Sequence, residues 1–333
     1  MAASVRDVAA RAGVSVGTVS NVLNSPGKVA AATAERVLAA IDDLGFVRND
    51  AARQLRVGRS SSIGLVVLDV RNPFFTDVAR GVEERAAAEG LSVLLANSDE
   101  RGDREAAHLA LFEEQRVRGI LISPVEEVLP QLQGLRNRGI PSVFVDRLAS
   151  TPGWSSVSVD DVRGGRDAAE HLLARGRRRL LFVGGPLDLR QVQDRLEGAR
   201  AAVAQVEEAR LDVLPVAGLT MAQGVAAGRR ILALGADLHT RSDAVVAGND
   251  LIALGVLQGV AINGGIRVPE DLAIVGYDDI DFAAAAAVPI TSIRQPRERM
   301  GALALELLLE QLDGKESRQI VLQPELVVRA SSG

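Results

Sequence analysis

Short runs of β-branched and other apolar residues alternate with amphipathic helical patterns from residue 62 onward, and this alternation restricts the fold more than any other feature of the sequence. The predicted strands are Ile63–Leu68, Ser92–Leu95, Gly119–Ile122, Ser142–Val145, Ser156–Val159, Leu180–Val183, Val213–Val216, Ala244–Val246 and Leu272–Val275. Helices are predicted between the strands, including Phe74–Glu89, Asp161–Arg175, Leu189–Glu207, Met221–Leu234 and Leu251–Ile262. Repeated strand–helix alternation is typical of α/β proteins with doubly wound parallel sheets.

The alternation occurs twice in series, near residues 62–160 and 161–290, and further elements follow it. These are a helix at Arg297–Leu312 and strands at Ile320–Leu322 and Glu325–Val328. Two sheets in series with late returning elements predict two lobes, similar to those of periplasmic binding proteins. A ligand of such sheets binds at the carboxyl ends of the strands, here between the lobes.

We expect both lobes to combine separated parts of the chain. Lobe 1 is predicted to comprise about residues 62–160 and 293–322, and lobe 2 about residues 161–290 and 323–330. The chain would return to each lobe at the start of the later range.

A segment of different composition precedes the alternation. Residues 1–59 carry eight Lys or Arg and five Asp or Glu, a net charge of +3, so the remaining residues carry −8 for a total of −5. A basic segment joined to a larger acidic one favours binding of a polyanion by the basic segment.

The basic segment contains three predicted helices. Ser4 and Ser15 are suitable N-caps for two short helices that are separated by a turn at Gly13. The second helix turns small or polar residues outward, and a third amphipathic helix covers about Thr33–Leu44. A second helix enters the major groove of DNA only if its outward residues are small or polar, so the pattern predicts a helix-turn-helix. The alternative is a three-helix domain without a nucleic-acid partner.

One more short helical pattern and a Gly/Ser linker connect the two parts of the chain. Asn49 can cap a helix that carries Ala52 and Leu55 on one face, flanked by Arg53 and Arg56. An isolated helix of this length is marginal in water, so we expect it to fold only against a partner copy and DNA. The predicted domains are residues 1–46 (helix-turn-helix), 47–61 (hinge helix and linker) and 62–333 (the two lobes).

The N-terminal part of the chain resembles the LacI/GalR family of transcription factors. The resemblance rests on Val5-Arg6-Asp7-Val8-Ala9, on Gly13–Asn24, and on Asn49 with Ala52-Arg53-Gln54-Leu55, and it continues through the chain. It implies a homodimer, joined through residues 62–333, that binds a palindromic double-stranded DNA operator. Paired hinge helices would insert Leu55 into the central minor groove and kink the duplex. The residues implied to contact DNA are Ser15, Val16, Gly17, Thr18, Ser20, Asn21, Asn24, Asn49, Ala52, Arg53 and Leu55.

Three positions depart from the family pattern and leave the operator sequence unpredicted. Gly17 offers no side chain at a position that usually reads a base. Ala30 replaces the Ser that usually caps the third helix, and Arg48 stands where many members have Pro. The resemblance implies that Val16, Gly17 and Asn21 stand at the positions where the family reads bases. It implies that Thr18, Ser20 and Asn24 stand where the family contacts phosphates.

Polar and aromatic residues follow the ends of the predicted strands in the two lobes. They include Asn72-Pro73-Phe74-Phe75 and the pair Asp146-Arg147. Aromatic rings can stack on the apolar face of a sugar, while a carboxylate accepts from its hydroxyls and a guanidinium donates to them. Singly these positions have structural alternatives, since Asn249 could be a helix cap, Asp278 a turn residue and Arg195 a surface cation.

Together the residues at the strand ends resemble the sugar contacts of ribose-binding members of this fold. The implied effector-binding residues are Asn72, Phe74, Phe75, Asp146, Arg147, Arg195, Leu219, Asn249, Asp278 and Gln295. Leu219 departs from the pattern, because an aromatic residue often stands there. The resemblance favours a pentose such as ribose or a related small sugar, with a hexose or a purine as alternatives. A sugar phosphate is disfavoured because Asp146 and Asp278 would repel it.

The resemblance implies a repressor whose operator affinity is controlled by the bound sugar. The sugar must bind one arrangement of the lobes better than the other, since equal affinity shifts no population. A sugar-binding transport protein is the alternative of another class, but it predicts a signal peptide and no helix-turn-helix. Asp7 and the lack of an early apolar run argue against a signal peptide, and no run approaches the ~20 apolar residues of a membrane span. We therefore predict a cytoplasmic protein.

Residues that carry most enzymatic chemistry are scarce in this chain. Cys is absent, and the three His residues (His108, His171 and His239) lie in helical stretches rich in Ala, Leu and Arg. The turn after the first strand lacks G-x-G-x-x-G, and no G-x-x-x-x-G-K-[ST] occurs. We predict no catalytic residues, no metal and no cofactor, and therefore no enzyme.

Overall fold

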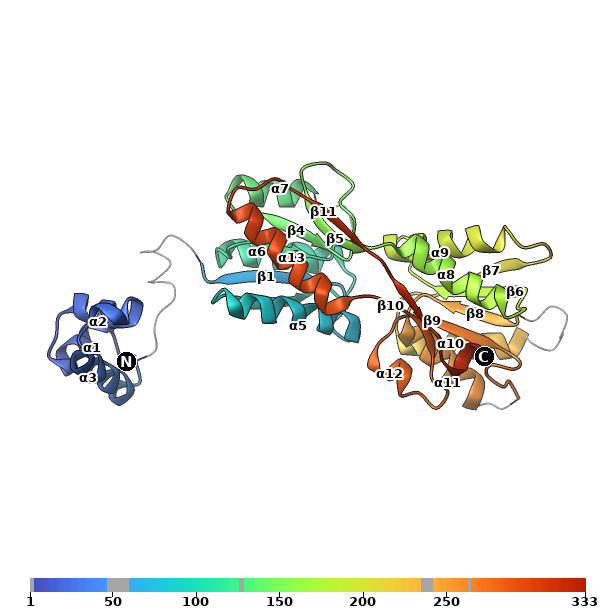
Figure 1. Cartoon of the computed structure of the whole chain (residues 1–333), viewed down its shortest axis with the longest axis horizontal. Coiled ribbons are helices and arrows are strands. Elements are labelled where there is room, and N and C mark those ends of the chain that lie inside the picture. The colour runs from blue at the N-terminus through green and yellow to red at the C-terminus, as the bar shows by residue number, and fades with distance from the viewer. Residues whose placement is uncertain (1–2, 47–59, 126–128, 235–241, 263–264) are drawn as a thin grey trace. The chain divides into compact units, whose positions relative to one another are not determined.

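The computed structural model describes residues 3–46, 60–125, 129–234, 242–262 and 265–333 (Figure 1). The chain divides into two compact units, Met1–Ser60 and Ser61–Gly333. The predicted hinge residues Asn49, Ala52, Arg53 and Leu55 lie outside the described residues.

The described residues of the first unit form α-helices, turns and no strand. Helix α1 covers Val5–Ala12, α2 covers Val16–Asn24 and α3 covers Ala31–Leu44, with a 3-10 turn at Pro26–Lys28. All three helices lie where the sequence predicts them, and together they confirm the helix-turn-helix.

Caps and a small core explain this arrangement. The hydroxyl oxygens of Ser4 and Ser15 accept hydrogen bonds from backbone N–H groups in the first turns of α1 and α2, as N-caps do. Gly13 ends α1 with φ of 64°, a conformation that favours glycine, and so turns the chain toward α2. One valine from each helix is fully buried between them: Val8, Val19 and Val37.

The second unit contains two six-stranded sheets, one in each lobe. The sheet of lobe 1 is parallel, in the order β11-β5-β4-β3-β1-β2. Its strands are β1 (Ser62–Val67), β2 (Ser92–Asn97), β3 (Ile120–Ile122), β4 (Ser142–Val145), β5 (Ser155–Val159) and β11 (Gln319–Leu322). Its helices are α5 (Pro73–Ala88), α6 (Gly102–Glu114), α7 (Leu129–Asn137) and α13 (Arg297–Leu312).

The sheet of lobe 2 has the order β12-β10-β9-β8-β6-β7, and its neighbouring strands are parallel except for β12, which runs antiparallel to β10. Its strands are β6 (Arg179–Gly184), β7 (Arg210–Pro215), β8 (Ala244–Ala247), β9 (Ala273–Asp278), β10 (Thr291–Arg294) and β12 (Glu325–Val327). Its helices are α8 (Asp161–Ala174), α9 (Arg190–Val203), α10 (Met221–Leu234), α11 (Asp250–Ile262) and α12 (Asp281–Ala284), followed by a 3-10 turn at Ala330–Ser332.

Helices cover both faces of each sheet, which confirms the predicted doubly wound fold. In lobe 1, α5 and α13 pack with Ile63 and Leu65 of β1, whereas Val66 joins the core on the α6 and α7 side. In lobe 2, α8 and α9 cover one face, and α10 and α11 cover the other. Strand residues that alternate between two apolar layers give the continuous apolar runs seen in the sequence.

The chain passes between the lobes after β5, after β10 and after β11. The prediction placed the second of these crossings near residue 293, but β10 belongs to lobe 2, so the crossing follows Arg294. Ile293 is buried and pairs with Tyr277 of β9. The polar residues Thr291 and Ser292 hid this strand in the sequence. Among the described residues, no helix is both long and apolar enough to cross a membrane.

Candidate ligand-binding site

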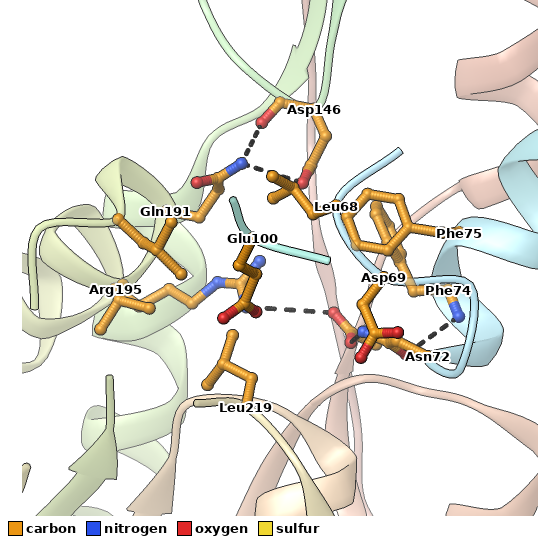
Figure 2. Close-up of a pocket in the computed structure, with 13 residues that line it drawn as sticks. Leu68, Asp69, Asn72, Phe74, Phe75, Glu100, Asp146, Gln191, Arg195 and Leu219 are labelled. Carbon is orange, nitrogen blue, oxygen red and sulfur yellow. Dashed lines mark hydrogen bonds and ion pairs between the residues drawn. The ribbon is translucent and has the colours of Figure 1, made fainter. Parts of the chain in front are cut away.

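A small cavity of about 30 Å³ lies between the two lobes, at the carboxyl ends of β1, β4 and β9 (Figure 2). Both lobes contribute to its wall. The lining residues are Leu68, Asp69, Asn72, Phe74, Phe75, Glu100, Asp146, Leu189, Gln191, Val192, Arg195, Leu219 and Asp278. The position agrees with the rule that ligands of parallel sheets bind beyond the strand ends.

The beginning of α5 forms the aromatic part of the wall. Asn72 caps α5, because its Oδ1 accepts a hydrogen bond from the N–H of Phe74 at 3.1 Å. Its Nδ2 donates across the cavity to Asp278 Oδ2 at 3.3 Å. The rings of Phe74 and Phe75 meet edge to face, 4.9 Å between centroids, and both side chains are buried. Asn72 therefore fixes the beginning of α5, which carries the two aromatic rings, and also makes one hydrogen bond between the lobes.

Arg195 of α9 lies deep in lobe 2 and is not a surface cation. Its Nε donates to Asp161 Oδ1 at 2.7 Å, and its Nη1 donates to the carbonyl oxygen of Gly248 at 2.8 Å. The guanidinium stacks 3.7 Å from the ring centroid of Tyr277, a cation–π contact. Arg195 is 4% exposed. Three neighbours thus hold this guanidinium in one orientation beside the cavity.

Asp278 ends β9 and binds residues from both lobes. Its Oδ1 accepts from Gln295 Nε2 at 2.7 Å and lies 4.0 Å from Arg195 Nη1. Arg297 Nη1 donates to the carbonyl oxygen of Asp278 at 2.6 Å. Burial raises the pKa of the Asp278 carboxyl, and the nearby Arg195 opposes this shift.

Asp146 follows β4 with a φ of 59°, in the left-handed region. Its backbone oxygen and its Oδ2 accept hydrogen bonds from Gln191 Nε2 at 2.8 and 3.1 Å, while Oδ1 is buried without a hydrogen-bond partner. Burial and the negative charge of Asp161 raise the pKa of the Asp146 carboxyl well above its ordinary value. This carboxyl group thus has one buried oxygen whose hydrogen-bonding capacity the described residues do not use.

The structure brings most, but not all, of the predicted effector-binding residues to this cavity. Those in its wall are Asn72, Phe74, Phe75, Asp146, Arg195, Leu219 and Asp278. Gln295 does not line the cavity, but it donates a hydrogen bond to Asp278, which does. Asn249 caps α11, since its Oδ1 accepts from the N–H of Ile252 at 2.9 Å, and its Nδ2 donates to the carbonyl of Leu219 at 3.1 Å.

Arg147 lines a neighbouring cavity of about 410 Å³ instead of the inner one. This outer cavity is lined by Asp146, Arg147, Leu148, Ser150, Ser158, Val159, Asp160, Asp161, Val162, Arg190, Gln191, Asp194 and Val321. Asp146 and Gln191 belong to both walls and separate the two cavities.

Six residues of the inner wall were missed by the sequence reasoning: Leu68, Asp69, Glu100, Leu189, Gln191 and Val192. Asp69 and Glu100 follow β1 and β2, so their positions at strand ends were a usable signal. Burial and the charge of Asp69 raise the pKa of Glu100. Gln191 carries no such signal, because it lies in the first turn of a helix and its partner is distant in the sequence.

Three of the predicted DNA-binding residues of α2 lie on its exposed side. Val16, Gly17 and Asn21 are exposed, and Thr18 and Ser20 are half-buried. Ser15 is exposed and its hydroxyl lies 2.9 Å from that of Thr18, and Asn24 is the last residue of the helix. An outer side with short side chains is compatible with entry into a major groove.

A helix-turn-helix unit in the same chain as two α/β lobes with a cavity between them is typical of a DNA-binding regulator of transcription. Residues 4–49 match bacterial regulatory proteins of the lacI family, and residues 169–332 match the periplasmic binding protein-like domain.

Known proteins are similar over nearly the whole chain. The ribose operon repressor of Bacillus subtilis is 36% identical, over 92% of this chain and 91% of the relative. The transcriptional repressor PurR of Photobacterium profundum is 32% identical, over 99% and 98%. A solved structure of the lac repressor dimer bound to operator and the anti-inducer ONPF has a TM-score of 0.84 at 26% identity, covering 100% of this chain and 99% of that one. The chain therefore belongs to the lacI family of bacterial regulatory proteins and is a DNA-binding transcriptional regulator.

Proposed function

We propose that this regulator is a repressor whose operator affinity is controlled by a small sugar, a pentose such as ribose, bound between the lobes. The proposal is carried by the meeting of Phe74, Phe75, Arg195, Asp146 and Asp278 in one cavity. Aromatic rings suit the apolar face of a sugar, carboxylates accept from its hydroxyls, and a guanidinium donates to its oxygens. The similarity to the ribose operon repressor of Bacillus subtilis supports this choice of ligand.

The size of the inner cavity links ligand binding to movement. A volume of about 30 Å³ holds on the order of one or two water molecules and not a sugar ring. A sugar therefore binds only when the lobes separate or the side chains between them move. A ligand that prefers one arrangement of the lobes increases the population of that arrangement. We propose that the change reaches the DNA through residues 47–61.

We propose that the protein acts in the cytoplasm as a homodimer on a palindromic operator, by binding alone and without a cofactor. The edge strand β2 exposes Leu94 and Leu95, and exposed apolar residues on an edge strand favour cover by a partner copy.

A purine is the second candidate effector. It is favoured by the 32% identity to PurR of Photobacterium profundum, which is nearly as high as the identity to the ribose operon repressor. The paired rings of Phe74 and Phe75 would then face a base.

A screen of thermal unfolding with pentoses, hexoses and nucleobases separates these candidates. We expect ribose or a related pentose to raise the melting temperature, because a ligand that binds only the folded state stabilises it. The stabilising compound should then change the binding of the protein to its own upstream DNA in a mobility-shift assay. Stabilisation by nucleobases alone would overturn the sugar assignment, and no salt-sensitive preference for any palindrome over random duplex would overturn the function as a whole.

Replacing Asn21 with alanine is expected to weaken operator binding by about 10- to 100-fold while leaving binding to random duplex unchanged. The exposed amide stands at a predicted base-reading position of α2, and a good bidentate contact to a base contributes about 1–3 kcal/mol of discrimination. Fluorescence anisotropy with labelled upstream DNA measures both affinities. Asn137→Ala, at an exposed site on α7, is the control. Equal losses on operator and random duplex would show that Asn21 does not read bases.

The affinity for the sugar is expected to rise with pH above about pH 4, where an ordinary Asp carboxyl titrates. Burial raises the pKa values of Asp146 and Asp278. In this pH range the carboxyl groups of the empty site therefore retain protons that an exposed carboxyl would have lost. Sugar hydroxyls donate best to ionised carboxylates, so binding releases protons and acidification weakens it. Calorimetry in buffers of different ionisation enthalpy measures the proton release. An affinity that is constant between pH 5 and pH 8 would contradict this expectation.

A further inference from the structure

The amide of Gln191 occupies a position that a ligand would need. Gln191 lies in the first turn of α9 in lobe 2, and its side chain crosses to Asp146 of lobe 1. One Nε2 group donates to both the backbone oxygen and Oδ2 of that residue, at 2.8 and 3.1 Å. Gln191 is 8% exposed and Asp146 is 4% exposed, so water reaches this bridge poorly. Figure 2 shows the amide pointing at Asp146 across the top of the cavity.

Two hydrogen bonds join the lobes between residues that line the inner cavity, and the Gln191 bridge is the shorter of the two. Arg297 of α13 also joins the lobes, through the carbonyl oxygen of Asp278, but it does not line this cavity. Asn72 Nδ2 reaches Asp278 Oδ2 at 3.3 Å, a longer and weaker contact. Asp278 also has Gln295 as a partner at 2.7 Å, so it is satisfied without the other lobe. Asp146 differs, because the only side-chain donor that the described residues offer to its carboxylate is Gln191, and its Oδ1 is buried without a partner.

We propose that Gln191 is an internal ligand of the effector site, which helps to hold the empty lobes together and must leave Asp146 before an effector can bind. On binding, an effector hydroxyl replaces the amide as donor to Asp146. The amide moves into the outer cavity of about 410 Å³, whose wall already includes Gln191. This exchange opens the inner cavity of about 30 Å³ to a sugar ring without leaving the buried carboxylate unpaired.

The bridge has two consequences for the regulator. Each sugar molecule must compete with an internal donor, so the internal donor lowers the measured affinity for the effector. The fraction of molecules with separated lobes is small before the effector arrives, and a binding-competent state of low population reduces affinity in proportion. Gln191 therefore sets the effector concentration at which the regulator responds.

Hydrogen–deuterium exchange of the full-length, ligand-free protein tests the bridge directly. Gln191→Ala is expected to speed amide exchange about tenfold in lobe 1, at the beginning of α5 and after β4, because the loss of a buried hydrogen bond of about 1.5 kcal/mol corresponds to a factor of ten. Gln191→Met keeps about the size but has no hydrogen-bond donor at any pH and should act in the same direction. Gln193→Ala is the matched control, since Gln193 is an exposed glutamine on the same helix that binds only the carbonyl of Leu187 within lobe 2. Faster exchange confined to α9 would show local loosening, and unchanged exchange in lobe 1 would overturn the proposal.

Titration with ribose tests the competition and rests on the function proposed above, whereas the exchange measurement does not. Calorimetry should show about tenfold tighter binding of ribose to Gln191→Ala than to the unaltered protein, and no change for Gln193→Ala. Weaker binding to Gln191→Ala would overturn the proposal, because Gln191 would then be a contact of the effector and not its competitor. If ribose binds none of the proteins, the choice of sugar fails while the exchange result still decides the role of Gln191.

Discussion

Replacing Arg195 with methionine is expected to abolish sugar binding and to lower the free energy of unfolding of the lobes by about 3–5 kcal/mol. The guanidinium is buried against Asp161, Gly248 and Tyr277, and it stands in the wall of the inner cavity. Methionine fills part of the volume but leaves the Asp161 carboxylate buried without its cation. Removing one member of a buried ion pair costs far more than the pair itself contributes. Urea unfolding followed by circular dichroism measures the stability, and calorimetry measures the binding.

The double variant Arg195→Met with Asp161→Asn separates the two effects. Asparagine removes the uncompensated charge, so we expect it to recover a large part of the lost stability. Sugar binding should not recover, because the donor to the sugar is still missing. Unchanged sugar affinity in Arg195→Met would show that the sugar does not contact this cavity wall, whatever happens to stability.

Replacing Gly165 with alanine is expected to lower the free energy of unfolding by about 2–3 kcal/mol. Gly165 lies in α8 where α9 crosses it, and a Cβ atom there would stand 1.9 Å from the carbonyl oxygen of Arg195. That neighbour is backbone and cannot rotate away, so the two helices must separate. Because the displaced backbone carries Arg195, we also expect the affinity for the sugar to fall. Urea unfolding and calorimetry measure the two changes.

Gly134→Ala is the control for this substitution, and its expected effect has the opposite sign. Gly134 lies in the middle of α7, where a Cβ atom would meet only the flexible guanidinium of Arg138 at 3.4 Å. Alanine is better than glycine in a helix interior by about 0.5–1 kcal/mol, so this variant should be slightly more stable. Equal destabilisation by both substitutions would mean that the α8–α9 crossing is not tight.

Most elements of the fold were predictable because a buried strand usually leaves a short run of apolar or β-branched residues between two helical patterns. The exception is β10, whose residues Thr291 and Ser292 are polar although both are buried. Ser292 Oγ donates to Asp250 Oδ1 at 2.7 Å, and Thr291 Oγ1 accepts from the N–H of Arg329 at 2.8 Å. A strand that satisfies its polar side chains through distant partners shows no pattern within its own segment.

The candidate site was predictable where a motif marks it and not where tertiary contacts create it. Phe74, Phe75 and Asp278 follow strand ends, so their positions could be inferred from the sequence. Arg195 was found through a family resemblance alone, since nothing in α9 distinguishes it from a surface arginine. Gln191 was missed because its role depends on Asp146, which belongs to the other lobe. Arg147 follows the same strand end as Asp146 but lines only the outer cavity.

The crossing of the chain after β10 has a consequence for synthesis. Helix α13 packs on α5 so closely that a Cβ atom on Gly81 or Gly301 would meet backbone of the other helix at 2.0 or 2.1 Å. The ribosome adds roughly 200 residues between these two helices, which at about 5–20 residues per second takes on the order of ten to forty seconds. During that interval Val78 and Val82 of α5 lack part of their final cover. We therefore expect nascent lobe 1 to need protection of its apolar segments, as chaperones provide, until α13 (residues 297–312 of 333) has emerged.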